Sequence, residues 1–235
     1  MFVITDYKIN EAASSALLRR GYEPIYMPPA SFLQKGVSSH PDMLIFLGFG
    51  KLFCHKKYYE NNRELIDRIA ALSGTELTLS EEKISADYPH DVPFNACLLG
   101  KRLICNEKTV SHLILSAARA FGCEIIGVPQ GYTKCSITVV SESAIITADK
   151  AISEVCRAFG IDVLTVCEGH ISLPPYNYGF IGGASGAHGD KVYFCGSLEG
   201  HPDGDRIKKF CDDHGKSAVS LSNGELQDVG SLFFI

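Results

Sequence analysis

Short apolar runs alternate with amphipathic helical patterns along the whole chain, and the same order of elements recurs five times. Each unit is predicted to contain a strand, a tight turn, a second strand, a helix, a glycine and a third strand. A recurring supersecondary unit of about 40–55 residues is typical of repeat folds that bury one continuous core. The glycines predicted to end the five helices are Gly21, Gly74, Gly122, Gly160 and Gly215.

One unit shows the pattern most clearly. Lys134–Val140 and Ala144–Ala148 flank a short polar turn and are predicted to form a hairpin. Asp149 then occupies the position of a helix N-cap, and Gly160 that of the left-handed residue after the helix. Between them, apolar residues recur at helical spacing, at Ile152, Val155, Cys156 and Phe159.

The other units follow the same plan with more variation. The Gly182–Gly189 segment looks like a phosphate loop but opens no helix, so we expect a flexible turn. Asp203 is expected to cap the helix that follows it. The paired first and second strands are predicted at Met43–Leu47 with Leu52–Cys54, Asn95–Leu99 with Arg102–Cys105, and Gly179–Ala184 with Val192–Cys195.

The two chain ends complete the fifth unit. Phe2–Thr5 is a second strand that lacks a first strand, and Leu232–Ile235 is a first strand with nothing after it. Pairing them would remove two exposed apolar edges at once. The sequence therefore predicts an α/β fold with one domain over residues 1–235, a closed pseudo-fivefold α/β propeller of five ββαβ units.

Composition narrows the class of protein. Hydrophobic residues make up 46% of the chain, and no apolar run is long enough to cross a membrane. The net charge of −5, without a basic stripe, argues against a nucleic-acid partner. The nine cysteines form no CxxC pair, and the N-terminus does not look like a secretory signal, so we expect a cytoplasmic protein without disulfides. No motif indicates a cofactor or a metal, and the oligomeric state is left open.

Five such units around a pseudo-fivefold axis resemble the pentein superfamily. It includes arginine and agmatine deiminases, dimethylarginine hydrolases, glycine amidinotransferases and non-enzymatic ribosome-associated factors. The resemblance covers essentially the whole chain and points to an uncharacterised bacterial branch. It implies a site on the axis, where the segment before each unit's first strand reaches the centre.

Five polar segments should therefore converge on the axis. Polar groups brought together from separate units are what a small-molecule site requires. The segments are 39–42, 90–95, 130–135, 175–178 and 225–231, and the expected ligand-binding residues are Asp42, Asp91, Asn95, Lys134, Asn177, Tyr178, Asp228 and Ser231.

The catalytic residues of guanidine-modifying penteins do not carry over to this chain. Those enzymes use a carboxylate, a general acid/base His and a Cys nucleophile near the C-terminus. The corresponding C-terminal segment, Asp228–Leu232, has no Cys, and Asn177–Gly179 stands where the His is expected. The carboxylate would fall near Tyr132–Cys135. The resemblance thus supports the fold and the position of the site more than the chemistry.

Three residues could provide a different chemistry. Cys135 lies beside Lys134, a cation that would lower the pKa of the thiol if the two side chains face each other. His40 and His90 are candidate bases, each with an Asp nearby. The alternatives are a buried Cys135 and histidines that only cap local turns. A metal site formed by His40, Asp42, His90 and Asp91 lacks any compact ligand spacing and is not predicted.

The sequence predicts binding of a small polar molecule, guanidino or amino-acid-like, in the axial pocket, with non-standard catalysis or none. One alternative is a thiol-dependent hydrolase or transferase that uses Cys135. A second is a non-enzymatic pentein that binds a macromolecular partner. An enclosed polar hole on the axis would favour ligand binding, whereas a filled axis with an exposed apolar patch would favour a partner.

Overall fold

The computed structural model describes residues 1–235 and contains five separate sheets of three strands each. In every sheet the middle strand is antiparallel to one neighbour and parallel to the other. Parallel neighbours need a long crossover connection, and a helical segment supplies it in each unit. The five predicted ββαβ units are therefore confirmed.

The elements are named in chain order. They are β1 (Phe2–Asp6), α1 (Glu11–Arg19), β2 (Glu23–Met27), α2 (Pro41–Leu44), β3 (Ile45–Gly48), β4 (Lys51–His55), α3 (Lys56–Asn61), α4 (Arg63–Ser73), β5 (Glu76–Ser80), β6 (Cys97–Leu99), β7 (Arg102–Cys105), α5 (His112–Ala120), β8 (Glu124–Gly127), α6 (Thr133–Ser136), β9 (Thr138–Ser141), β10 (Ala144–Thr147), α7 (Lys150–Ala158), β11 (Asp162–Thr165), β12 (Ser185–His188), β13 (Lys191–Phe194), the 3₁₀ turn η1 (Leu198–Gly200), α8 (Gly204–Asp213), β14 (Ser217–Ser220) and β15 (Phe233–Phe234).

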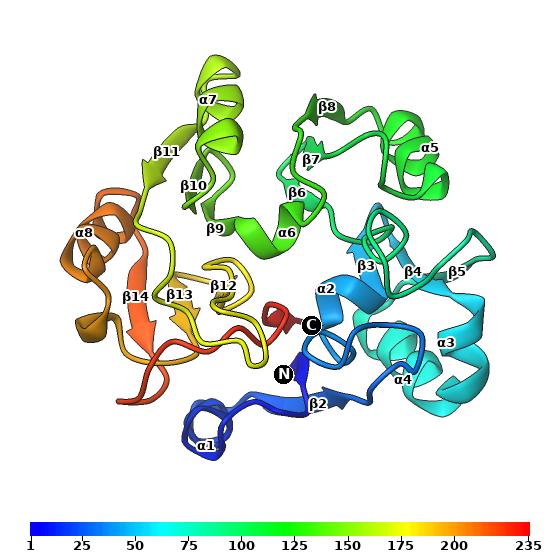
Figure 1. Ribbon diagram of the computed structural model, residues 1–235, viewed down its shortest axis with the longest axis horizontal. Helices are drawn as coiled ribbons and strands as arrows, with labels where there is room; N and C mark the ends of the chain where they lie inside the picture. Colours follow the sequence, from blue (N-terminus) through cyan, green and yellow to red (C-terminus); the bar gives the residue numbers. More distant parts are fainter.

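The two chain ends pair as predicted. β15 is antiparallel to β1, with Val3 opposite Phe234 and Ile4 opposite Phe233. The backbones of Phe2 and Ile235 exchange two hydrogen bonds of 2.9 Å each. Figure 1 shows both termini near the centre, the five units around them, and α1, α4, α5, α7 and α8 on the outside. The pairing completes the fifth sheet and leaves neither terminal strand unpartnered.

Local signals explain where the helices begin and end. Asp149 caps α7 by accepting the N–H of Ile152 at 2.9 Å, as predicted. Asp203 precedes α8 but makes no capping bond. It accepts the backbone N–H of Cys167 at 2.7 Å instead, and thus joins two units. The predicted glycines, Gly21, Gly74, Gly122, Gly160 and Gly215, all have φ between 64° and 83°.

Several first strands begin later than the apolar pattern predicts. Met43 and Leu44 belong to α2, and Lys134 to Ser136 belong to α6 rather than to a strand. The strand paired with β13 is Ser185–His188, so the prediction at Gly179–Ala184 was wrong. Near the axis the chain forms short helical turns, because buried polar side chains offer hydrogen bonds that compete with the sheet.

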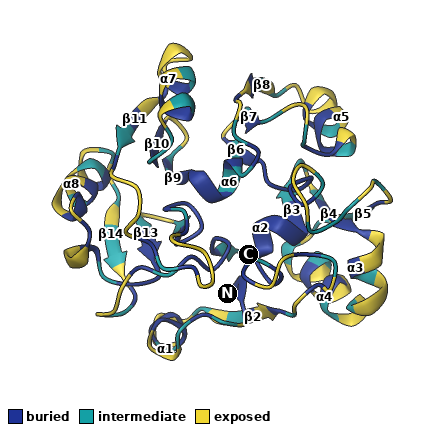
Figure 2. Ribbon diagram, viewed as in Figure 1, coloured by how far each residue is buried: buried dark blue, intermediate teal, exposed yellow.

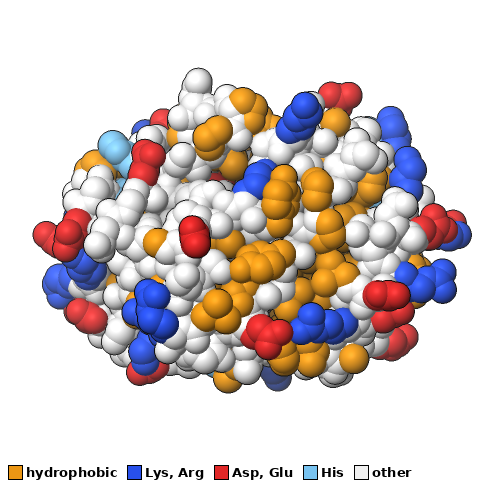
Figure 3. Space-filling view, turned by 90° about the horizontal axis from the view of Figure 1, so that it is seen from below, with side chains coloured by type: hydrophobic (Ala, Val, Ile, Leu, Met, Phe, Trp, Pro, Cys, Tyr) orange, Lys and Arg blue, Asp and Glu red, His pale blue; other side chains and the backbone are white.

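The inner parts of the units are buried, and the outer helices each expose one face. Figure 2 shows α2, α6 and β9 as buried at the centre, whereas the outer faces of α4, α5 and α8 are exposed. Viewed from below, hydrophobic side chains gather in the middle of the surface and charged ones around them (Figure 3). No helix combines the length and apolar character that crossing a membrane would require.

Candidate functional site

An open pocket of about 310 Å³ lies on the axis, at the ends of the inner strands where the chain enters them. Four of the five predicted axial segments, all except 90–95, contribute to its lining. The axis is therefore not filled. The lining residues are Val37, His40, Tyr132, Cys135, Leu173, Tyr176, Tyr178, Phe180 and Asp228.

His40 lies between two buried carboxylates at the wall of this pocket. Its Nε2 is 3.5 Å from Oδ2 of Asp6, and its Nδ1 is 3.6 Å from Oδ1 of Asp228. Neither ring nitrogen has a hydrogen-bond partner. Burial, with the charge of Lys8 nearby, lowers the pKa of His40 to about 3. The imidazole is therefore neutral at physiological pH, with two unpartnered nitrogens at the pocket wall.

Asp228 is the carboxylate that lines the pocket. Its Oδ2 accepts the N–H of Phe180 at 2.9 Å, and its Oδ1 accepts the N–H of Gly230 at 3.0 Å. Burial, and then the nearby charge of Asp42, raise its pKa to about 7. No lysine or arginine pairs with it directly, because its only ion-pair neighbour is His40. Its charge is thus poorly compensated within the protein.

Asp42 lies deeper, in a chain of polar contacts along the axis. Ser231 Oγ is 2.8 Å from Asp42 Oδ2, and Lys134 Nζ donates to the same hydroxyl at 2.8 Å. The other oxygen of Asp42, Oδ1, has no hydrogen-bond partner. Burial raises the pKa of Asp42 despite the charge of Lys134. Lys134 is therefore linked to Asp42 indirectly, through the hydroxyl of Ser231.

Cys135 lines the pocket but is only 2% exposed. Its Sγ accepts a hydrogen bond from Asn95 Nδ2 at 2.9 Å. Burial, followed by the charges of Asp42 and Asp228, raises the pKa of the thiol well above its ordinary value. Lys134 contacts Ser231 and does not pair with the sulfur. Cys135 is therefore a neutral thiol in an acidic environment.

Asn95 fixes the backbone of α6. Its Oδ1 accepts the N–H groups of Lys134 at 2.7 Å and Cys135 at 3.2 Å, while its Nδ2 also donates to the carbonyl of Asp42 at 3.2 Å. These bonds satisfy donors at the start of a short helix, where no intrahelical partner exists. Asn95, predicted as a ligand-binding residue, therefore also connects three units around the axis.

Aromatic side chains form the rim of the pocket. The rings of Tyr132 and Phe180 stack at 5.9 Å with an interplanar angle of 23°. The Tyr132 hydroxyl donates to Oδ2 of Asp91 at 2.5 Å, which fixes the orientation of the ring. Tyr176 and Tyr178 are 43% and 42% exposed and lie at the opening. A ligand that enters the pocket would pass ring faces before it reaches Asp228.

The glycine-rich segment packs closely against this site. A Cβ on Gly183 would overlap the carboxylate of Asp228, and a Cβ on Gly230 would overlap His40. Gly230 also has φ of 65°, which side chains rarely adopt. Gly183 accepts the N–H groups of Val229 at 3.0 Å and Ser231 at 2.8 Å. This part of the segment predicted as a flexible turn therefore supports the backbone around Asp228, and Gly230 packs against His40.

The structure separates the predicted site residues into groups. His40, Cys135, Tyr178 and Asp228 line the pocket, and Asp42, Asn95 and Ser231 lie behind it. His90 and Asn177 do not line it: His90 is half-buried in a loop, and Asn177 is exposed. Asp91 reaches the rim only through Tyr132.

Asp6 and Phe180 were not predicted as site residues. Asp6 accepts the Ser39 hydroxyl at 2.7 Å and is close to His40. A carboxylate at the end of a buried strand was the sequence signal that could have identified it. No three His, Cys, Asp or Glu side chains are arranged to hold a metal ion. The four residues considered for a metal are thus not gathered into such a group.

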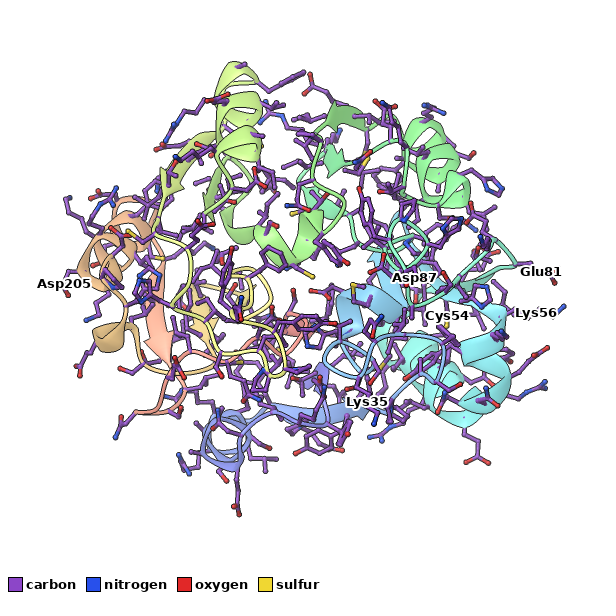
Figure 4. The ribbon with its side chains drawn as sticks, in the orientation of Figure 1. Lys35, Cys54, Lys56, Glu81, Asp87 and Asp205 are labelled. Carbon is purple, nitrogen blue, oxygen red and sulfur yellow. The ribbon has the colours of Figure 1, made fainter.

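The charges on the outer surface of the molecule are exposed, unlike those at the axis. Lys56 and Glu81 form an exposed ion pair of 2.5 Å, and Figure 4 places them at the edge opposite Asp205. Exposed pairs of this kind contribute little to stability, because water and salt screen them. The buried carboxylates around His40 are therefore the charges that distinguish the axis from the surface.

Solved structures with a similar fold are guanidine-modifying proteins. Agmatine deiminase from C. jejuni has a TM-score of 0.60 and 7% identity over 98% of this chain and 94% of its own. DDAH from Pseudomonas aeruginosa, complexed with citrulline, has a TM-score of 0.58 and 7% identity over 94% and 91%. SxtG, an amidinotransferase from Microseira wollei, has a TM-score of 0.55 and 10% identity over 94% and 88%. These similarities confirm the predicted pentein fold.

No curated protein matches the sequence. A family model matches residues 4–233, which is nearly the whole chain. The five-unit fold, the axial pocket and this match together assign the chain. It is a pentein-fold protein that belongs to the family described as "Family of unknown function (DUF6873)".

Proposed function

We propose that this protein binds a small organic cation, guanidino or amino-acid-like, in the axial pocket. The observation that carries the proposal is Asp228, a buried carboxylate at the pocket wall without a lysine or arginine partner. A ligand cation would supply the missing charge in a site where water screens little.

The surrounding charges support a cation rather than an anion. Asp6 and Asp42 lie within the same buried region, and His40 between Asp6 and Asp228 is neutral. Lys8 is occupied by Asp6, at 3.4 Å. Lys134 donates to Ser231 behind the pocket. The pocket wall therefore presents a carboxylate and an imidazole, but no cation.

The aromatic rim supports a flat cation in particular. Ring faces attract cations electrostatically, and guanidinium groups also stack on them. Tyr132, Phe180, Tyr176 and Tyr178 supply such faces between the opening and Asp228. The volume of about 310 Å³ falls at the lower end of the range for small-molecule sites, about 300–1,000 Å³. The similar DDAH structure holds citrulline, a molecule of suitable size.

The proposal assigns no nucleophilic role to Cys135. A thiolate is the reactive form of cysteine, and the neighbouring carboxylates disfavour it here. The thiol-dependent enzyme that the sequence left open would need a cation beside Sγ, and Lys134 points elsewhere. Cys135 then serves as an uncharged part of the pocket wall.

Calorimetric titration with L-arginine, agmatine and citrulline tests the proposal. Arginine and citrulline have similar shapes, but only arginine carries a charged side chain. We expect arginine or agmatine to bind at least tenfold more tightly than citrulline. Binding should strengthen from pH 6 to pH 8 and release a proton, because the cation favours ionised Asp228, whose pKa is raised to about 7.

Two variants provide the specificity controls. Asp228→Asn should abolish the preference for the charged ligand, whereas Asp205→Asn, an exposed substitution on α8, should leave it unchanged. Thermal unfolding checks that each variant is folded. Equal affinity for arginine and citrulline, or an Asp228→Asn variant that still prefers arginine, would show that the pocket does not select a cation.

A further inference from the structure

A second cavity, open to solvent, lies where the five inner strands meet and extends to the end of α4. Its volume is about 480 Å³, and each of the five inner strands contributes to its lining. The axial pocket is lined by residues that precede the inner strands, whereas this cavity is lined mainly by residues within them. The contributing strand residues include Leu47, Leu98, Val139, Ala187 and Phe234.

The lining is mostly apolar and contains a single charged side chain. Of its 16 residues, 11 are hydrophobic, and none is Asp or Glu. The charged residue is Lys134, which does not line the axial pocket. An open, mostly apolar pocket with one cation in its lining is complementary to a molecule with a hydrocarbon body and one anionic end.

The ammonium group of Lys134 has only uncharged neighbours within hydrogen-bond distance. It donates to Ser231 Oγ at 2.8 Å and to the carbonyl of Ile137 at 3.5 Å, and it lies 5.7 Å from the ring centroid of Phe233. It forms no ion pair, whereas Lys8, Lys51, Lys56 and Lys191 each pair with a carboxylate. Charge-assisted bonds to a carboxylate are stronger than these neutral contacts.

We propose that this second cavity binds an amphipathic monocarboxylate, such as a medium-chain fatty acid. The carboxylate would pair with Lys134, and the hydrocarbon would lie along the apolar inner strands. The site differs from the axial pocket in lining, charge and position, and it does not depend on the function proposed for that pocket. The volume of about 480 Å³ is within the range of small-molecule sites.

Titration calorimetry with decanoate tests this site, with 1-decanol and decylamine as probes of equal chain length. Wild-type protein should bind decanoate at least tenfold more tightly than either probe, because only decanoate carries an anion. Lys134→Met, which keeps the hydrocarbon stem, should weaken decanoate binding at least tenfold and leave decanol unchanged. Lys134→Arg should retain most of the affinity.

Two further variants serve as controls. One reduces the volume of the cavity, and the other removes a lysine charge elsewhere on the surface. Ala187→Leu narrows the cavity and should weaken all three probes together. Lys150→Met, on the exposed start of α7, should change none of them. Thermal unfolding of each variant confirms its fold. The proposal is overturned if decanoate does not bind at 1 mM, about a thousandfold above a micromolar site, or if it binds Lys134→Met as tightly as wild type.

Discussion

The Nδ1 of His40 lies 3.6 Å from Oδ1 of Asp228, and both side chains are almost completely buried. Two ionisable groups that lose their hydration together both favour their neutral forms. Burial lowers the pKa of His40 to about 3 and raises that of Asp228 to about 7. The interior at the axis thus favours the uncharged forms of both groups.

This arrangement predicts an unusual pH dependence of stability. The folded-state pKa of Asp228 exceeds its unfolded value, so its contribution to stability is present below about pH 4 and is lost as the pH rises through about 7. Asp228→Asn removes this loss. We expect the free energy of unfolding of the variant, relative to wild type, to increase by about 1–3 kcal/mol between pH 5 and pH 8.

Denaturant unfolding at several pH values measures this difference. The contribution of His40 to the free energy of unfolding changes with pH in the opposite direction, because its pKa is lowered. His40 is present in both proteins, so its contribution largely cancels in the comparison. The matched control is Asp205→Asn, whose carboxylate is fully exposed. If the difference in the free energy of unfolding between Asp228→Asn and wild type did not change with pH, ionisation of Asp228 would not destabilise the folded protein.

Cys135 should react slowly with iodoacetamide at pH 7. Its thiol is 2% exposed, and burial with two nearby carboxylates raises its pKa, so the thiolate fraction is very small. Cys167 is exposed and should be modified first. Mass spectrometry of peptides from native protein gives the order of labelling. Preferential labelling of Cys135 would restore the thiol-dependent enzyme as the better hypothesis.

Asn95→Ala should lower the free energy of unfolding by about 2–4 kcal/mol. The substitution leaves the buried N–H groups of Lys134 and Cys135 and the carbonyl of Asp42 without their partner. Asn177→Ala is the control, because Asn177 is exposed and should change stability by less than about 0.5 kcal/mol. Urea unfolding of both variants provides the comparison. Equal stability of the two would mean that Asn95 is dispensable for α6.

Deleting Leu232–Ile235 should cause self-association. The deletion removes β15 and exposes the apolar edge of β1, and a free hydrophobic edge is a template for pairing between molecules. Light scattering coupled to size-exclusion chromatography would detect the oligomers. Phe121→Ala removes an exposed aromatic side chain far from this edge and should leave the elution unchanged. A monomeric deletion variant would show that β15 is not needed to protect β1.

The sequence by itself determined the number and order of the units. In each unit, the helix before the third strand is followed by a glycine, because a left-handed backbone position excludes most side chains, and this local requirement is visible in the sequence. Apolar patterns at both ends likewise predicted the pairing of β1 and β15. These features depend on neighbouring residues or on the need to cover an apolar edge.

Only the tertiary structure decided which polar residues form the site. His40, Asp6 and Asp228 come from distant segments, and their charges depend on mutual burial, which no local pattern encodes. Lys134 and Cys135 are adjacent in sequence, but Lys134 lines the second cavity, whereas Cys135 lines the axial pocket. The predicted strand there is a helical turn because Asn95, from another unit, accepts its N–H groups. Long-range hydrogen bonds overrode the local pattern at the axis, where the units meet.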